Sequence, residues 1–159
     1  MIVVRAAAPE DREIVVSLLT GSWGGTAMVV HGVRHDADEL PALIAWLDGG
    51  PVGLLTYVIA ADALEVVTLD AALPRAGVGT ALLAAAADTA RASGADRLWV
   101  TTTNDNLDAL RFYQRRGLRL TALAPGAVDE ARKLKPSIPV IGDNGIALHD
   151  ELTLELHPL

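Results

Sequence analysis

The chain of 159 residues contains no cysteine, which excludes disulfide bonds, thiolate catalysis and cysteine-based zinc sites. It has no run of about 18 or more apolar residues, and its first residues lack the pattern of a secretion signal, so we expect a cytoplasmic protein that does not contact a membrane. Basic residues are outnumbered by acidic ones, 13 to 20, and the formal net charge of −7 argues against a general nucleic-acid binder.

Aromatic residues are also scarce, at 4%, so the core must consist mainly of Ala, Val and Leu. The hydrophobic fraction of 51% and the charged fraction of 21% are not those of a disordered chain. No repeat, low-complexity segment or linker divides the sequence. We therefore expect one domain over residues 1–159.

Apolar runs and turn residues predict a mixed order of strands and helices. Strands are expected at residues 2–5, 27–31, 43–47, 52–60, 64–69, 97–102, 118–123 and 152–156. Helices are expected after Pro9 and over residues 78–93, 107–116 and 127–133, and residues 20–26 resemble a loop. The third to fifth strands follow one another through turns, whereas a helix joins the fifth strand to the sixth as a parallel pair. The predicted fold class is α/β with a mixed sheet.

A Gly-X-Gly turn, Gly77-Val78-Gly79, lies between an apolar strand and an Ala-rich helix. Glycine lets the backbone approach a ligand closely, and the first N–H groups of a helix have no partner within it, so this order predicts an anion site. The turn is not a Walker loop, and it lacks the third glycine of a dinucleotide fingerprint. We expect the N–H groups of residues 78–80 to hold a diphosphate, with Arg75 adding positive charge.

A second motif runs from Asn106 to Leu118 with the sequence Asn-Leu-Asp-Ala-Leu-Arg-Phe-Tyr-Gln-Arg-Arg-Gly-Leu. Together with the glycine turn it resembles the GCN5-related N-acetyltransferase (GNAT) superfamily. That family joins an acetyl-CoA loop, Arg/Gln-x-x-Gly-x-Gly/Ala, to a later segment, Asn-x-x-Ala-x-x-Phe/Leu-Tyr-x-x-x-Gly-Phe. The resemblance covers about residues 64–123, and the matching positions of the later segment are Asn106, Ala109, Phe112, Tyr113 and Gly117.

The chain departs from this pattern at two positions. Leu118 stands where the family has Phe, and Pro74 stands where the family has Arg or Gln. The cation Arg75 is therefore displaced by one residue. Because the loop amides supply most of the diphosphate binding, the departure leaves the expectation of acetyl-CoA intact.

The resemblance implies a central mixed, mostly antiparallel sheet flanked by helices, with a parallel strand pair that splays apart at the cofactor. The acyl arm of acetyl-CoA would lie between these strands and pair with backbone groups. Asn106 would bind the pantetheine arm, and Tyr113 would lie near the thioester sulfur. The cofactor-binding residues implied in this way are Leu69, Asp70, Ala71, Arg75, Ala76, Gly77, Val78, Gly79, Thr80, Asn106 and Tyr113.

The resemblance also implies direct transfer of an acetyl group to a primary amine of a small molecule or a protein. Tyr113 would protonate the leaving thiolate, unless it is only a core aromatic on a helix face. Glu65 would take the proton of the attacking amine, directly or through water, unless it is a solvated carboxylate on a strand. Weaker candidates for this base are Asp70, His31, His149 and Glu151.

The acceptor amine cannot be deduced from the motifs. The family binds it through the regions that correspond here to residues 20–35 and 136–150, and Trp23 either covers a core edge or lines a substrate mouth. The negative net charge suits a cationic amine. Dimerisation is common in the family, so a homodimer is an open expectation.

Two other kinds of function remain open. The chain could be a catalytically silent domain that binds or senses acyl-CoA, or a module that binds a nucleotide other than CoA. A metal site is not expected: His31 and His35 stand four residues apart, but Gly32 and the β-branched residues before it argue against a helix, and no third ligand is visible.

Overall fold

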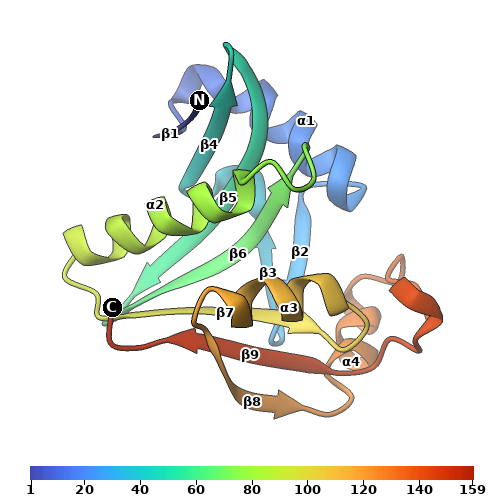
Figure 1. Ribbon diagram of the computed structural model, residues 1–159. Helices are drawn as coiled ribbons and strands as arrows, with labels where there is room; N and C mark the ends of the chain where they lie inside the picture. Colours follow the sequence, from blue (N-terminus) through green and yellow to red (C-terminus); the bar gives the residue numbers. More distant parts are fainter.

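The computed structural model describes all of residues 1–159 and contains a seven-stranded sheet with helices on both faces (Figure 1). All neighbouring strands are antiparallel except β6 and β7, which are parallel. This confirms the predicted mixed, mostly antiparallel sheet. In spatial order the strands are β1 (Ile2–Ala6), β4 (Ala42–Leu47), β5 (Gly50–Ala60), β6 (Ala63–Ala71), β7 (Arg97–Thr103), β9 (Glu151–Leu156) and β8 (Arg119–Ala124).

Two further strands, β2 (Ala27–Val30) and β3 (Val33–Asp36), form a separate hairpin. The helices are α1 (Arg12–Trp23), α2 (Val78–Ala92), α3 (Leu107–Arg115) and α4 (Ala127–Leu134), with short 3₁₀ turns η1 (Pro9–Asp11), η2 (Ala37–Glu39) and η3 (Asp143–Gly145). No helix combines the length and the apolar character that a membrane crossing requires.

Side chains alternate between the two faces of the sheet and build two core clusters. The larger cluster lies on the face covered by α2 and α3, which cross in front of the sheet in Figure 1. The smaller cluster lies on the opposite face, beneath α1 and β2. Strands β4 and β5 contribute Leu43, Ala45 and Leu55 to the larger cluster and Ala42, Ile44 and Leu54 to the smaller.

The structure corrects the sequence-based prediction at two places. Residues 20–23, expected in a loop, continue α1, which ends only at Gly24 with φ 75° and a hydrogen bond from its N–H to the Thr20 carbonyl. The weak helix propensity of this segment is overridden because Trp23 is anchored by a tertiary hydrogen bond. Strand β3 was not predicted, because its residues, Val-Arg-His-Asp, have no apolar alternation. The other predicted elements are present with small shifts at their ends.

Strands β6 and β7 separate part-way along their length. They pair from Ala63 with Arg97 as far as Val66 with Val100. At the same point the pairing of β6 with β5 shifts by one residue, so that Val67 forms a bulge. Beyond it β6 pairs only with β5 and β7 only with β9. The facing backbone edges of the two parallel strands are therefore left open to a ligand.

Gly53 lets α2 approach the sheet beside this opening. A Cβ atom at Gly53 would lie 2.4 Å from Val78 Cγ1 and 2.9 Å from the Asp70 carbonyl oxygen. Gly53→Ala is therefore expected to lower the free energy of unfolding by about 1–3 kcal/mol through overpacking, measured by urea denaturation. Gly50→Ala is the matched control, because its Cβ would meet nothing closer than 3.6 Å. Equal urea midpoints for the two variants would contradict the close approach.

Candidate active site

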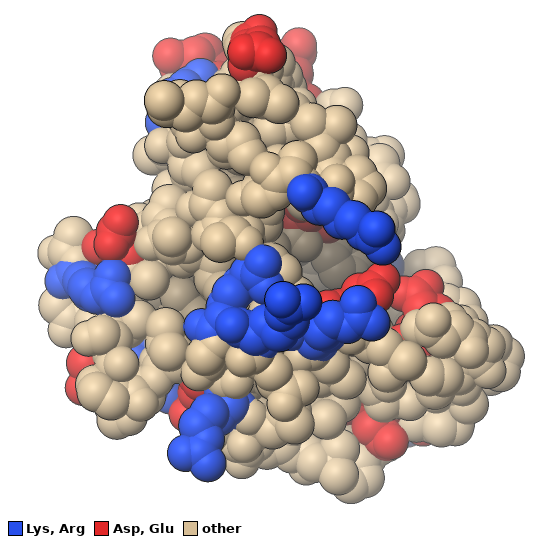
Figure 2. Space-filling model, viewed as in Figure 1, with Lys and Arg blue, Asp and Glu red and all other residues tan.

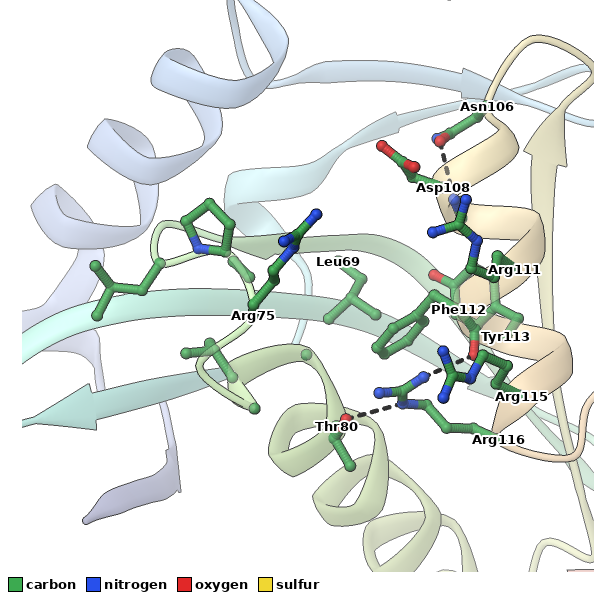
Figure 3. Close-up of a pocket in the computed structure, with 17 residues that line it drawn as sticks. Leu69, Arg75, Thr80, Asn106, Asp108, Arg111, Phe112, Tyr113, Arg115 and Arg116 are labelled. Carbon is green, nitrogen blue, oxygen red and sulfur yellow. Dashed lines mark hydrogen bonds between the residues drawn. The ribbon is translucent and has the colours of Figure 1, made fainter.

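A cavity of about 700 Å³ lies where β6 leaves β7, between the start of α2 and α3 (Figure 3). It gathers most of the residues expected to bind the cofactor, although they come from β6, the loop before α2, and α3. Asp70 and Ala76 are the two expected residues that do not line it. Those that line it are Leu69, Ala71, Arg75, Gly77, Val78, Gly79, Thr80, Asn106 and Tyr113.

The first turn of α2 faces this cavity with free backbone donors. Gly77 is the N-cap residue with φ 81°, and no side chain caps the helix. The N–H groups that open the helix therefore have no side-chain partner and carry the positive end of the helix dipole. Arg75 also has a positive φ, 61°, so the preceding loop is tightly turned. This arrangement is suited to an anion such as a diphosphate.

The anion loop is braced by α3. A Cβ atom at Gly79 would lie 3.0 Å from Phe112 Cε1, so only glycine lets the two helices meet this closely. Arg116 Nε donates a hydrogen bond of 2.8 Å to Thr80 Oγ1, and its guanidinium lies 3.9 Å from the centre of the Phe112 ring. The side chains of one motif thus fix the backbone of the other.

Basic side chains gather around the cavity in an otherwise acidic protein. Figure 2 shows them beside a hollow, and those that line it are Arg75, Arg111, Arg115 and Arg116. Sequence reasoning assigned a role only to Arg75. The spacing of Arg111 and Arg115, four residues apart on α3, was the signal that could have identified a basic helix face.

Asn106 has a structural task as well as a place in the cavity. Its side-chain oxygen accepts a hydrogen bond of 3.1 Å from the Ala109 N–H and so caps α3. The amide nitrogen is the part of this side chain that the cap does not use. Asn106 also borders a second cavity, described below, so it stands at the boundary of the two.

Tyr113 lies in the larger core cluster and only 5% of its surface is exposed. Burial, and secondly the negative charge of Asp70, raise the pKa of its phenol well above the ordinary value. The phenol therefore keeps its proton and can serve as a hydrogen-bond donor. Because Tyr113 both packs in the core and lines the cavity, the two interpretations of this residue are compatible.

Asp70 points to the opposite face from Tyr113's helix, toward α1. Its carboxylate accepts a hydrogen bond of 2.7 Å from Trp23 Nε1. Burial raises the pKa of Asp70 to about 6, and the hydrogen bond from Trp23 partly offsets this rise. Trp23 also lines the second cavity, which favours the interpretation that it borders a substrate mouth.

Glu65 is buried, with 7% of its surface exposed, and Oε2 lies 2.6 Å from His31 Nε2. The alternative that it is a solvated strand carboxylate is therefore wrong. It stands on β6 one residue before the last residue that pairs with β7. It thus lies next to the point where the two strands part.

The other candidate bases are divided between two places. The His31 backbone N–H donates to Glu151 Oε1 at 3.1 Å, and burial raises the pKa of Glu151. Glu65, His31 and Glu151 therefore form one group. His149 is exposed and its Nδ1 lies 3.2 Å from Asp129 Oδ2, so it belongs to a surface ion pair outside this group.

A second cavity, of about 420 Å³, lies on the face of the sheet that α1, β2 and α4 cover. It includes Val67 of the bulge and Glu151 of β9. Apolar side chains from β2 and α4 form much of its wall, and Asp105, Asp143 and Glu151 add carboxylates. The two cavities thus approach the separated strands from opposite faces.

Comparison with known proteins identifies the family. The model of the acetyltransferase (GNAT) family matches residues 12–118. The chain belongs to the GNAT family. It is 40% identical over 144 residues to the uncharacterized protein YxbD of Bacillus subtilis (strain 168), covering 90% of this chain and 91% of YxbD.

Solved structures share the GNAT fold over the whole chain. The IAA acetyltransferase of Bacillus cereus ATCC 14579 superimposes with a TM-score of 0.74 at 20% identity, covering 99% of both chains. A Bacillus subtilis acetyltransferase in complex with CoA also gives a TM-score of 0.74 at 20% identity, covering 100% of both. The ribosomal-protein-S18-alanine N-acetyltransferase of Escherichia coli gives 0.70 at 14% identity, covering 99% of this chain and 94% of that one.

Pro74, where the chain departs from the family pattern, lies in the loop that leads into α2. Pro74 and Arg75 both line the arginine-lined cavity, and α2 begins at Val78, directly after Gly77. The loop therefore keeps its backbone donors although the usual cation is missing from position 74. Arg111 and Arg115, from α3, add positive charge to the same cavity.

Asp70→Asn tests the buried carboxylate. The pKa of Asp70 is raised to about 6 in the folded state, so the folded protein binds this proton more tightly than the unfolded chain does. The resulting stabilisation of the fold is fully present at low pH and is lost as the pH rises through about 6. Asn accepts the Trp23 hydrogen bond without the charge. The difference in melting temperature, Asp70→Asn minus the unmodified protein, should therefore increase as the pH is raised from about 4 to about 7. Asp48→Asn, in an exposed turn, is the control and should show no such trend.

Proposed function

We propose that this chain is an N-acetyltransferase that moves the acetyl group of acetyl-CoA to a primary amine. The observation that carries the proposal is that two cavities reach the separated strands β6 and β7 from opposite faces. One has free helix N–H groups and four arginines, which suit the phosphates of CoA. A neighbour of the same fold is described in complex with CoA, and another with acetyl-CoA.

The acyl arm would lie in the gap that opens after Val66 and Val100, hydrogen-bonded to the free edge of β6 around Leu69, Asp70 and Ala71. A strand N–H in the gap would also stabilise the oxyanion of the tetrahedral intermediate. The thioester would then be reachable from the second cavity through the opening beside the Val67 bulge. This geometry favours direct attack without a covalent enzyme intermediate.

In the reaction the amine nitrogen attacks the thioester carbon, a C–N bond forms, and the C–S bond breaks. Glu65 takes the proton that the amine loses, directly or through one water, and passes it by way of His31 to solvent. His31 suits this role because its side chain is 34% exposed while Glu65 is buried.

Tyr113 would act on the leaving group. Because burial raises its pKa, full transfer of its proton to a thiolate, whose acid has a pKa of about 8.5, is uphill. We therefore assign it the role of a hydrogen-bond donor that stabilises the departing sulfur, which takes up a proton from solvent after release.

The acceptor is proposed to be a cationic amine with an apolar body. The second cavity combines apolar walls with three carboxylates, and its one lysine, Lys135, is held by a hydrogen bond of 2.9 Å to the Ala27 carbonyl. An ammonium group would be attracted there, and it loses one proton to solvent before the neutral amine attacks.

A thiol-release assay with acetyl-CoA and a panel of primary amines tests the activity. Glu65→Gln should lower kcat by about 100-fold or more, the range expected for a lost general base, and leave the Kd for acetyl-CoA unchanged. Tyr113→Phe should lower kcat by about 10-fold, the lower range for one hydrogen bond to a charged group. Tyr57→Phe, at a tyrosine outside both cavities, is the control. Thiol release at background with every amine, despite acetyl-CoA binding, would favour a silent acyl-CoA-binding domain.

The phosphate side is tested separately by binding. Arg75→Gln and Arg111→Gln should each raise the Kd for CoA by about 3- to 10-fold, and the effect should shrink at high salt. Arg91→Gln, near the far end of α2, should bind CoA as the unmodified protein does. If Arg75→Gln and Arg111→Gln bind CoA with the same Kd as Arg91→Gln and the unmodified protein, Arg75 and Arg111 do not contact the cofactor.

A further inference from the structure

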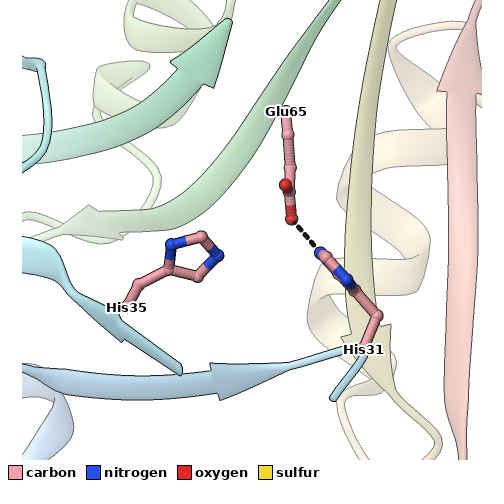
Figure 4. Close-up of side chains that lie close together, drawn as sticks. All are labelled: His31, His35 and Glu65. Carbon is pink, nitrogen blue, oxygen red and sulfur yellow. Dashed lines mark hydrogen bonds and ion pairs between the residues drawn. The ribbon is translucent and has the colours of Figure 1, made fainter. Parts of the chain in front are cut away.

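Three side chains that can bind metals converge on the face of β6 opposite α2. His31 lies at the β2–β3 turn, His35 on β3 and Glu65 on β6, and Figure 4 shows both imidazole rings near the Glu65 carboxylate. One potential ligand atom of each lies within 4.8 Å of the others. The sequence offered only two of these ligands, since Glu65 is 30 or more positions away.

His35 has no explained role in the folded protein. Its Nε2 atom is buried and has no hydrogen-bond partner. Figure 4 shows the ring directed toward His31 and Glu65. A buried polar atom without a partner is costly, and such an atom in a native fold calls for a reason. The proposed acetyl transfer gives His35 no task, so a bound ion would supply that reason.

The chemistry of the three ligands favours a particular class of ion. Two imidazoles and one carboxylate form the set that holds zinc in sites with an open fourth position, whereas Mg²⁺ and Ca²⁺ prefer oxygen ligands. Glu65 is buried and Glu151 lies against the His31 backbone, so the surroundings carry negative charge. No arginine or lysine pairs with Glu65; its ion-pair partner is His31.

The three ligand atoms need to shift by about 1–1.5 Å to surround an ion: His31 and Glu65 move apart, and the widest pair moves together. Zinc–ligand distances of about 2.0–2.1 Å place tetrahedral ligand atoms about 3.3 Å apart. The His31–Glu65 pair is at 2.6 Å and the widest separation is within 4.8 Å. The hairpin that carries both histidines pairs with no strand of the main sheet, so it can shift as a unit. The partly exposed His31 ring leaves a path from solvent.

We propose that His31, His35 and Glu65 form a binding site for zinc or a similar divalent transition metal. A metal there engages the carboxylate that the proposed acetyl transfer uses as its base. Resting on that function, the metal is expected to inhibit acetyl transfer.

Binding is tested on the full chain without reference to activity. Equilibrium dialysis with Zn²⁺ should give one tightly bound ion per chain, and Co²⁺ should give the visible absorption of a four- or five-coordinate site. His35→Ala and His35→Gln should each weaken zinc binding by about 10-fold or more. His149→Ala is the matched control, because it removes a histidine that lies outside the cluster. Circular dichroism checks that each variant is folded.

Two results would overturn the site. One is the absence of saturable one-to-one binding by Zn²⁺ or Co²⁺ to the unmodified protein. The other is zinc binding by folded His35 variants that equals that of the unmodified protein. The inhibition is read separately: zinc should suppress thiol release by the unmodified protein and not by His35→Gln, whose activity without zinc should be normal. A chain that binds zinc through His35 but releases no thiol would retain the metal site and lose the proposed function.

Discussion

The parting of β6 from β7 after Val66 and Val100 is the constraint on which the rest of the structure depends. Two parallel strands held together to their ends would satisfy their own backbone groups and leave nothing for a ligand. The Val67 bulge shifts the register of β6 at this point, so that the strand continues with one edge free. Both cavities are placed by reference to that gap, and Glu65, which lines neither of them, lies on β6 just before it.

The two sides of the gap are built differently. On the side of the arginine-lined cavity, α2 and α3 are held together by the Gly79–Phe112 approach and by Arg116, so the backbone donors are fixed before a ligand arrives. Such preorganisation lowers the cost of binding an anion. On the other side the walls come from α1, β2, α4 and the separated parts of β6 and β7, and no helix begins there with free N–H groups among the lining residues named above.

Local patterns in the sequence predicted residues that the structure gathers around one cavity. Gly77 to Gly79 and Asn106 to Leu118 are short motifs whose spacing already determines which backbone groups and which helix face are presented. Glu65, His31 and His35 could not be joined in this way, because their proximity depends on how the hairpin folds over β6. The contact of Trp23 with Asp70, 47 positions apart, is of the same kind. Helix α1 was predicted to end too early because Thr20 and Gly21 are weak helix formers and their tertiary anchor is invisible in sequence.

The β2–β3 hairpin forms a sheet of its own and pairs with no strand of the seven-stranded sheet. Its strand ladder is internal, and its backbone is joined to the rest of the chain by side chains, Glu151 at the His31 N–H and Lys135 at the Ala27 carbonyl. Substitutions in it therefore leave the backbone pairing of the main sheet unchanged. The side chains that β2 contributes to the second cavity can therefore vary while the pairing of β6 with β5 and β7 stays constant. The shape of that cavity can thus change through one short hairpin, at little cost to the stability of the sheet.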